Sequence, residues 1–344
     1  SDVWRIQQIR RFLADPEHPY SSFSTGNRET LEGIRREEFI DFFNRHYSAN
    51  QMALALAGTA SLDRMETWVR TYFSEIENKE VERIRYPQRI FKPVDAARVV
   101  TIEPVKEMQN LWFIFGIPSM REDYDGKAGE LISYVLGFEG EGSLLSKLKE
   151  EGLATSFGAS PSYTTDDFGI LYMGADLTPK GLENYERVLE IIFGYVEMMR
   201  NEPYPEYLFH ERAVMARLVE LYDDKGEGAD RAVELANAAL NYPLEDVERI
   251  EYTWREPDPE GYFAILDALR PNNMLAKLIG KGVPTDQVEP YFDARFSYTE
   301  ETGELYRRLN HPNPESLAGI ALPPPNPFIP DRVELLAERP LELI

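Results

Sequence analysis

Apolar residues recur at helical spacing through long parts of this chain, and these parts alternate with short apolar runs. Near the start, Ile6, Ile9 and Leu13 fall three or four residues apart, which predicts an amphipathic helix. Thr178-Pro179 opens the steadiest repeat, and a proline suits the first turn of a helix. Further helices are predicted over 35–46, 61–72, 127–136, 144–151, 205–222, 229–240 and 258–269.

Short apolar runs bounded by turn residues predict strands. They cover 51–58, 99–103, 111–117, 153–160, 168–177, 273–280 and 292–298. The runs 153–160 and 168–177 are expected to pair with each other. Strands joined by long helices, with some hairpin pairing, predict an α+β fold in which helices cover one face of a mixed or antiparallel sheet.

A charged segment with two prolines, residues 78–98, is typical of a linker and divides the chain. We therefore expect a first unit over 1–82, a linker over 83–98 and a second unit over 99–330. After a proline-rich stretch, 331–344 is expected to be an exit segment. The chain opens in a helical pattern without an initiating Met, which suggests a piece of a longer protein.

The composition of the chain limits which partners and which kinds of site it can have. The net charge of -23 and the pI near 4.7 disfavour nucleic acid and anionic membranes as partners. No apolar run approaches the roughly 20 residues that span a bilayer. The chain has no cysteine, which excludes disulfides, thiolate zinc sites and cysteine nucleophiles. The lack of cysteine is compatible with a bacterial periplasm or a cytoplasm and does not choose between them.

The residues alone indicate no catalytic centre. The four histidines, His18, His46, His210 and His311, lie too far apart for one helix to present a pair to zinc. No Gly-x-Ser-x-Gly nucleophile elbow occurs. The glycine-rich segment 137–142 lacks the lysine of a phosphate loop, and its two glutamates would repel phosphate.

The segment "HPYSSFSTGNRETL", residues 18–31, combines aromatic, hydroxyl and turn-forming side chains. Such a loop could hold a substrate or a metal, or it could have a structural role only. Its polar groups suit local turn bonding, so we expect it to brace the first unit. Thr25-Gly26-Asn27 would form a turn and Thr30 a helix cap.

This segment and "GFEGEGSLLSKLKEEGLATSFGAS", residues 137–160, resemble the insulinase/pitrilysin family of zinc metallopeptidases, in its insulysin-like branch. The resemblance extends from Trp4 to the proline-rich tail. It implies an insulinase-like second domain, 99–330, preceded by part of a domain of the same type. The family holds zinc with an inverted His-x-x-Glu-His motif and a distal Glu. By the resemblance, these residues lie upstream of Ser1, so this chain alone is expected to hold no metal and to be inactive.

The resemblance also implies a peptide-binding exosite, where an edge strand takes up the N-terminal end of a substrate by strand addition. The matching strand residues are Leu153, Thr155, Phe157, Gly158 and Ala159. Period-two alternation would place the side chains of Leu153, Thr155 and Phe157 on one face of the strand. Pro161 would come only after the strand has ended.

A glycine-rich knuckle beside that strand completes the implied exosite. It consists of Gly137, Phe138, Glu139, Gly140 and Glu141. Its two carboxylates would meet the α-ammonium group of a peptide. The alternative is that they are solvated loop acids.

Two functions stay open from the sequence. The chain is either a non-catalytic part of an active zinc endopeptidase, with zinc in the parent enzyme, or part of an inactive relative that acts as a binding partner. Expected partners are peptide substrates and the remaining domains of the parent. Residues 1–82 are expected to expose an apolar face that favours self-association.

Overall fold

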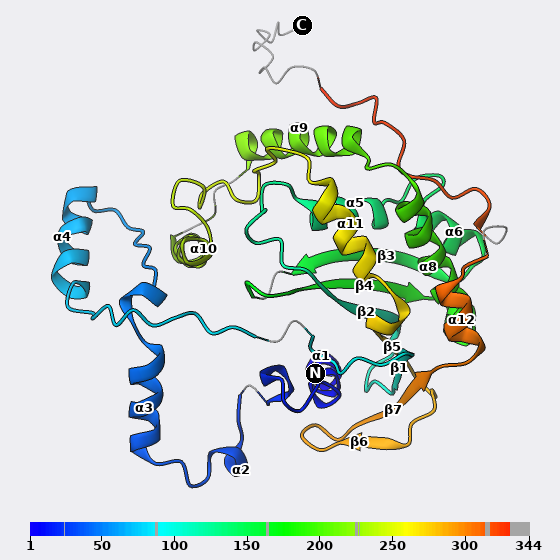
Figure 1. The fold of residues 1–344 in the computed structure, drawn as a ribbon, viewed down its shortest axis with the longest axis horizontal. Coiled ribbons are helices and arrows are strands. Elements are labelled where there is room, and N and C mark those ends of the chain that lie inside the picture. Colours follow the sequence, from blue (N-terminus) through cyan, green and yellow to red (C-terminus); the bar gives the residue numbers. More distant parts are fainter. Residues whose placement is uncertain are drawn as a thin grey trace, which may run out of the picture.

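The computed structural model describes residues 1–23, 25–86, 89–162, 165–223, 226, 228–313 and 317–330. The exit segment expected over 331–344 lies outside the described residues. Within them, a seven-stranded mixed sheet and a layer of helices form the main body (Figure 1). This arrangement confirms the α+β fold that the sequence predicts.

The strands run in the order β3-β4-β2-β5-β1-β7-β6. β1 pairs with β5 in parallel, and the other neighbours are antiparallel. Their bounds are Ala97–Ile102 (β1), Gln109–Ile117 (β2), Ala154–Ser162 (β3), Gly169–Leu177 (β4), Met274–Gly280 (β5), Gln287–Glu289 (β6) and Ala294–Glu301 (β7).

The helices begin and end close to the predicted positions. Their bounds are Asp2–Phe12 (α1), Arg28–Leu31 (α2), Arg36–His46 (α3), Leu62–Phe73 (α4), Ala128–Leu136 (α5), Leu144–Glu150 (α6), Pro179–Glu183 (α7), Tyr185–Asn201 (α8), Glu206–Tyr222 (α9), Gly228–Asn241 (α10), Pro259–Ala268 (α11) and Glu304–Asn310 (α12). Within the described part of the chain, none is long and apolar enough to cross a membrane. The sequence missed β6, α12 and the break between α7 and α8 at Asn184.

The larger core lies between the sheet and the helices α5, α8 and α11, which lie together on one face of the sheet (Figure 1). Alternate residues of β2 and β4 point into this core, as period-two spacing requires. Phe113 and Phe115 of β2 are fully buried there, and the ring of Phe115 meets that of Phe193 on α8 edge-on. The helical layer therefore fixes the strands that lead to the β3 edge.

The opposite face of the sheet has its own smaller core, covered by α1. Ile6 and Ile9 of this helix are buried against residues of the central strands, among them Val100 and Ile114. Asp2 at the start of α1 accepts hydrogen bonds from the backbone N–H groups of Val105 and Lys106, at 2.8 and 3.0 Å. α1 thus packs on the sheet built from 97–301, although the sequence assigns it to the first unit.

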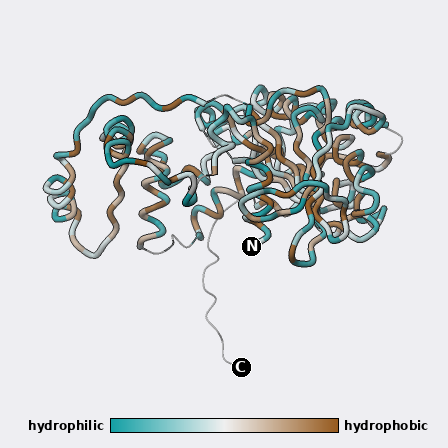
Figure 2. Tube along the Cα trace, turned by 90° about the horizontal axis from the view of Figure 1, so that it is seen from below, coloured by the Kyte–Doolittle hydropathy of each residue, from teal (hydrophilic) through white to brown (hydrophobic). Residues whose placement is uncertain are grey.

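An arm that contains α3 and α4 stands away from the body (Figures 1 and 2). The strand predicted over 51–58 is wrong: this segment has no strand assignment and no paired strand among the described residues. Met52, Leu54 and Leu56 are 40%, 49% and 47% exposed. A strand needs a partner for its backbone groups, and period-two patterning alone does not supply one.

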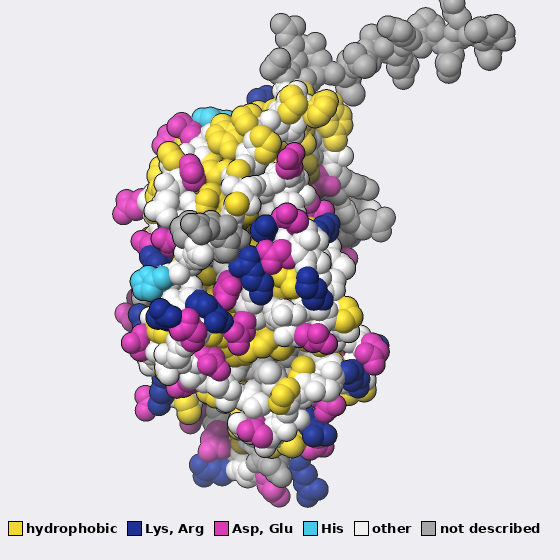
Figure 3. Space-filling model, turned by 90° about the vertical axis from the view of Figure 1, so that its right-hand side faces the viewer, with side chains coloured by type: hydrophobic (Ala, Val, Ile, Leu, Met, Phe, Trp, Pro, Cys, Tyr) yellow, Lys and Arg dark blue, Asp and Glu magenta, His cyan; other side chains and the backbone are white. Residues whose placement is uncertain are grey.

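Acidic and basic side chains are interspersed over much of the face shown in Figure 3, and apolar side chains gather at its upper end. On this face the acidic groups therefore lie among basic ones and form no single continuous acidic patch.

Lys277 is an exception to the apolar lining of the smaller core. It lies in the middle of β5 and is 6% exposed. Burial, together with the positive charge of Arg10, lowers its pKa to about 7. In an unfolded chain the pKa of a lysine is near 10.5, so the unfolded state binds more protons between about pH 7 and 10.5.

We predict that Lys277→Met stabilises the protein at pH 6 by about 1–4 kcal/mol, because it removes a buried charge. The advantage should shrink as pH rises from 7 towards 10, since the unfolding free energy of the unsubstituted protein rises over this window. Denaturant unfolding at several pH values in low salt measures this. Lys281→Met, at an exposed position just beyond β5, is the control, and a pH-independent difference would contradict the prediction.

Candidate peptide-binding edge

β3 lies at one edge of the sheet, and β4 is its one partner strand among the described residues. The strand follows α6 through a tight turn at Gly152, whose φ of 68° lies in the left-handed region that favours glycine. Both α5 and α6 pack against β3. The outer edge of the strand therefore faces away from the sheet, while its inner face is held by two helices.

The start of β3 is fixed by the segment that follows β4. The carbonyl of Leu153 accepts hydrogen bonds from the backbone N–H and the hydroxyl of Thr178, at 3.0 and 3.3 Å. Gly181 of α7 approaches so closely that a Cβ there would lie 1.8 Å from the Leu153 carbonyl oxygen. The backbone at 153 is thus clamped from one side.

The alternation predicted for Leu153, Thr155 and Phe157 is wrong at Thr155. Ala154 pairs with Leu177, and Ser156 pairs with the adjacent residue of β4, Asp176. Thr155 is therefore the extra residue of a β-bulge. Leu153, Ala154 and Phe157 are buried, whereas Thr155 is exposed.

The strand is also longer than predicted. β3 continues through Pro161, which pairs with Leu171, so Pro161 lies inside the strand and not after it. Proline is tolerated in edge strands because the group it lacks, the backbone N–H, is not needed on the free side.

Gly158 and Ala159 occupy the middle of the edge. Gly158 is exposed and pairs with Gly174 of β4, and a Cβ added at Gly158 would contact nothing within 4 Å. Trp112 of β2 covers Gly174 on the same face, since a Cβ at Gly174 would lie 2.9 Å from the indole ring. Gly158 itself therefore presents bare backbone at the edge of the sheet.

The knuckle, Gly137–Gly142, joins α5 to α6. Glu139 and Glu141 are exposed and form no ion pair with any residue that the structure describes. Gly140 lies against the ring of Phe138, and the carbonyl of Gly142 accepts a hydrogen bond from the Ala321 N–H at 2.9 Å. Among the described residues, no hydrogen bond or ion pair joins either carboxylate to β3. The knuckle lies between α5 and α6, the two helices that pack against the strand.

Glu151, at the C-terminal end of α6, differs from the knuckle glutamates. Arg187 donates two hydrogen bonds to its carboxylate, at 2.9 and 2.6 Å. These bonds hold the pKa of Glu151 below its usual value, against the opposing effect of burial. Glu151 thus links α6 to α8 through Arg187. Glu139 and Glu141 have no such ion pair among the described residues, so their carboxylates could bind a ligand.

The loop 18–31 contacts the sheet and not only the first unit, contrary to expectation. The ring of His18 meets Phe168 edge-on at 5.8 Å, and Phe23 stacks on Tyr291 at 4.3 Å. The end of the loop behaves largely as predicted: Asn27 caps α2 and Thr30 completes a reciprocal capping box.

The histidines do not gather in the structure. His18 is buried, and its Nδ1 accepts a hydrogen bond from the Tyr20 N–H at 3.0 Å, while His210 is exposed beside Glu206. Over the described ranges, no group of three His, Asp or Glu residues is placed to hold a metal ion.

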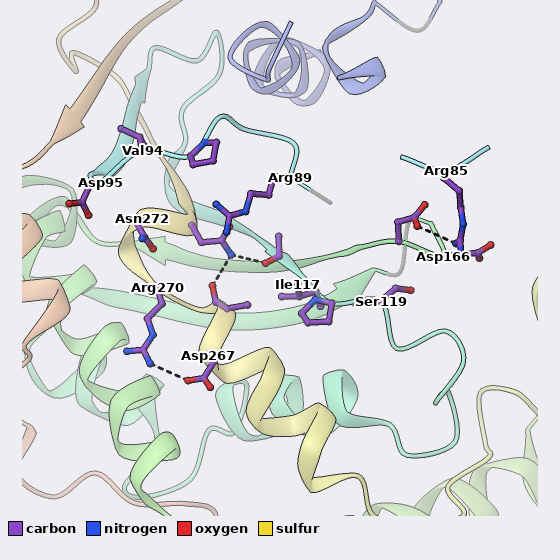
Figure 4. A pocket seen from close by; sticks show the side chains of 16 residues that line it. Arg85, Arg89, Val94, Asp95, Ile117, Ser119, Asp166, Asp267, Arg270 and Asn272 are labelled. Atoms are coloured by element: carbon purple, nitrogen blue, oxygen red, sulfur yellow. Dashed lines mark hydrogen bonds and ion pairs between the residues drawn. The ribbon is translucent and has the colours of Figure 1, made fainter. Parts of the chain in front are cut away.

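A separate polar pocket of about 840 Å³ lies between the segment 85–95 and the end of β2 (Figure 4). Its acidic groups are already engaged: Asp267 pairs with Arg270 at 3.1 Å, and Asp167 pairs with Arg85 at 3.1 Å. Asp166, from the same β3–β4 connection as Asp167, also binds arginines. The pairs made by Arg83 and Arg85 fasten the connecting segment to the β3–β4 hairpin, so we assign the pocket a structural role.

Comparison with known proteins gives the family. The description "Peptidase M16 inactive domain" matches residues 33–214, and the middle or third domain of peptidase M16 matches residues 221–342. The chain belongs to the M16 peptidase family.

Curated relatives of this M16 chain are longer proteins. Human insulin-degrading enzyme is 31% identical over 351 residues, which cover 99% of this chain and 34% of the relative. The A-factor-processing enzyme of Saccharomyces cerevisiae is 30% identical, covering 96% of this chain and 33% of the relative. The chain therefore spans about a third of the length of these relatives.

The crystal structure of pitrilysin has the same fold, with a TM-score of 0.88 and 24% identity, covering 97% of this chain and 36% of that one. An M16 inactive domain from Pseudomonas fluorescens matches with a TM-score of 0.57 and 18% identity, covering 83% of this chain and 67% of that one. These matches confirm the fold of the M16 chain.

We predict that Gly181→Ala destabilises the protein by about 1–3 kcal/mol, because the new methyl group would displace the Leu153 carbonyl and the start of β3. Gly158→Ala is the matched control and should change the unfolding free energy by less than about 0.5 kcal/mol, since nothing lies near its Cβ. Denaturant unfolding of both variants measures this, and equal stabilities would contradict it.

Proposed function

We propose that this chain is a non-catalytic part of an insulysin-like zinc metalloendopeptidase that degrades peptides. Its second unit, 99–330, forms part of the wall of the substrate chamber. The β3 edge, from Leu153 to Ala159, takes up the N-terminal end of a peptide by strand addition, and the knuckle, Gly137–Gly142, receives the α-ammonium group.

The observation that carries this proposal is the edge position of β3 with an exposed glycine at its middle. Main-chain hydrogen bonds to an edge strand give affinity with little demand on sequence. Bare backbone at Gly158 leaves room for a second chain to approach. Glu139 and Glu141, which no arginine or lysine of the described chain neutralises, suit an ammonium group.

Zinc belongs, in this proposal, to the parent enzyme, and this chain by itself neither binds stoichiometric zinc nor cleaves peptides. The support is the scattered placement of the histidines, because a zinc site needs clustered ligands. Peptide substrates and the remaining domains of the parent are the proposed partners.

We predict that an isotope-labelled basic peptide binds this chain and is recovered intact. Gly158→Pro should weaken binding about tenfold or more, because it disrupts the edge backbone, while Gly158→Ala should weaken binding less, because it adds a methyl group beside an intact backbone. NMR titration measures both, with circular dichroism to verify the fold. Unchanged binding in Gly158→Pro, cleavage of the peptide or stoichiometric zinc in metal analysis would contradict the proposal.

The knuckle is tested separately by an acetylated peptide. Removing the α-ammonium group should weaken binding about two- to fivefold, as for exposed ion pairs. In Glu139→Gln/Glu141→Gln the same loss should appear for the free peptide, and acetylation should then have no further effect. Glu122→Gln, at an exposed carboxylate elsewhere, is the control. If the losses from acetylation and from the double substitution add, the two carboxylates do not bind the ammonium group, and the role given to the knuckle is contradicted.

The alternative is that the parent is an inactive family member that acts as a binding or structural partner. In this alternative the arm would be a binding surface, since α3 and α4 expose large apolar side chains to solvent. Phe39 is 61%, Phe42 52% and Phe43 53% exposed. Patches of this kind are typical of surfaces that another chain or domain covers.

We predict that the chain self-associates through this arm in a concentration-dependent way. Phe39→Ser/Phe43→Ser should reduce association because it removes apolar surface from α3. Light scattering over a concentration series measures this, with Tyr222→Ser, an exposed residue at the end of α9, as the control. A strictly monomeric unsubstituted chain would contradict it.

A further inference from the structure

Three rows of side chains cross the sheet beside the β3 edge, on the face opposite α5, α8 and α11. The alternate residues of the same strands, such as Phe157, Met173 and Phe113, point into the larger core instead. Read from β3 through β4 to β2, the rows are Ser156–Asp176–Asn110, Gly158–Gly174–Trp112 and Ser160–Tyr172–Ile114. We call the middle one the glycine row, since two of its three members are glycine.

Within the glycine row, Trp112 covers Gly174. A Cβ added at Gly174 would lie 2.9 Å from Cδ1 of Trp112 and 3.4 Å from its Nε1. The indole ring from β2 therefore occupies the space that a side chain of β4 would fill. Aromatic side chains pair in this way with glycines of neighbouring strands and shield their bare backbone.

Gly158, the other glycine of the row, has no such cover. It lies in the edge strand, where β4 is its one neighbour among the described residues. A Cβ added at Gly158 would meet nothing within 4 Å. Neighbouring strands lie about 4.8 Å apart, so the open space over Gly158 begins one strand away from the indole ring of Trp112. A ring placed over Gly158 would therefore reach the edge of that indole.

The two outer rows are already engaged in contacts of their own. Asp176 accepts hydrogen bonds from Nδ2 of Asn110 and Oγ of Ser156, at 2.5 and 2.6 Å. Tyr172 accepts one from Arg10 at 3.3 Å, and the guanidinium group lies 5.6 Å from its ring centre. The glycine row between them is the part of this face that lacks a side chain at the edge, and the group nearest to it is an aromatic ring.

We propose that the peptide residue opposite Gly158 carries a large aromatic side chain, which lies over Gly158 and packs against the indole edge of Trp112. This inference rests on the function proposed above, the addition of a peptide strand to β3. The regular stretch Ser156–Ser160 presents three positions on this face, and Gly158 is the middle one, so a single peptide residue is selected.

Phe, Tyr or Trp suits this position for two reasons. The ring supplies the apolar area that Gly158 lacks, and aromatic rings favour edge-to-face contacts of the kind that the indole edge offers. The substrates of this edge are therefore peptides with an aromatic residue near the N-terminal end.

A set of alanine–lysine peptides with a free N-terminus tests the inference. One Phe is moved along the peptide, and at the best position it is replaced by Leu, Arg or Ala. We expect Phe at one position, and not at the two adjacent ones, to lower Kd about three- to tenfold relative to Ala, with Leu between them. Equal Kd values at all positions would overturn the inference. So would tighter binding of Arg than of Phe, because the Asp176 carboxylate would then govern selection.

The same set separates this inference from the proposed function. If the Ala peptide binds and Gly158→Pro weakens its binding, strand addition holds, and a missing preference for Phe refutes the aromatic site alone. If no peptide of the set binds, both fail.

Two variants locate the preference. Gly158→Val fills the open space but keeps the backbone N–H and carbonyl groups of the edge. We expect the ratio of Kd values for the Ala and Phe peptides to fall to about one in this variant. Ser160→Ala, at an exposed position of the same face, is the matched control and should keep the ratio. Circular dichroism verifies the fold, and a preference for Phe that persists in Gly158→Val would overturn the inference.

The indole N–H signal of Trp112 in ¹H–¹⁵N NMR spectra reports on the contact directly. It is assigned as the indole signal that Trp112→Leu removes. We expect the Phe peptide to shift this signal through the ring current of the bound phenyl group, and the Ala peptide to shift it much less. Equal shifts with both peptides at saturation would overturn the inference.

Discussion

The central strand β5 must be covered on both faces, and the rest of the structure follows from that requirement. Every residue of β5 is buried, with β1 parallel on one side and β2 antiparallel on the other. Helices α5, α8 and α11 cover one face, and α1 covers the other. The sheet is less completely buried at β3, where Thr155, Gly158 and Ser160 are exposed. An edge strand with exposed backbone is thus what remains after the centre is buried.

The sequence predicted those elements whose burial is decided locally. Helices with a clear apolar stripe, such as α8, and strands with continuous apolar runs, such as β2, lie where the pattern places them. The segment 51–58 has equally good alternation, yet it forms no strand. Pairing depends on a partner strand, which no pattern within the segment encodes. The same limit explains why the packing of α1 on the sheet could not be foreseen.

The candidate site was predictable in position but not in detail. The resemblance to the M16 family pointed to residues 153–159, and the hairpin partner followed from the apolar run after it. The bulge at Thr155 lies two residues after Leu153, whose carbonyl contacts Thr178 and Gly181, and such contacts between distant positions cannot be read from a local pattern. Lys277 is a single lysine within an apolar run of the sequence, but only the structure shows that it is buried beside the ring of Trp112.

The bulge and Pro161 together limit what the β3 edge can recognise. Between them, Ser156–Ser160 is the stretch with regular pairing on β4, so an added strand would find few main-chain hydrogen bonds. Each such bond contributes about 0.5–1.5 kcal/mol net, while ordering a peptide residue costs about 1–2 kcal/mol. Gly158 offers no side chain to compensate. An edge this short cannot select a peptide by main-chain bonds, so discrimination would fall to the peptide's terminal ammonium group, at the carboxylates of the knuckle, and to the side chain that lies over Gly158.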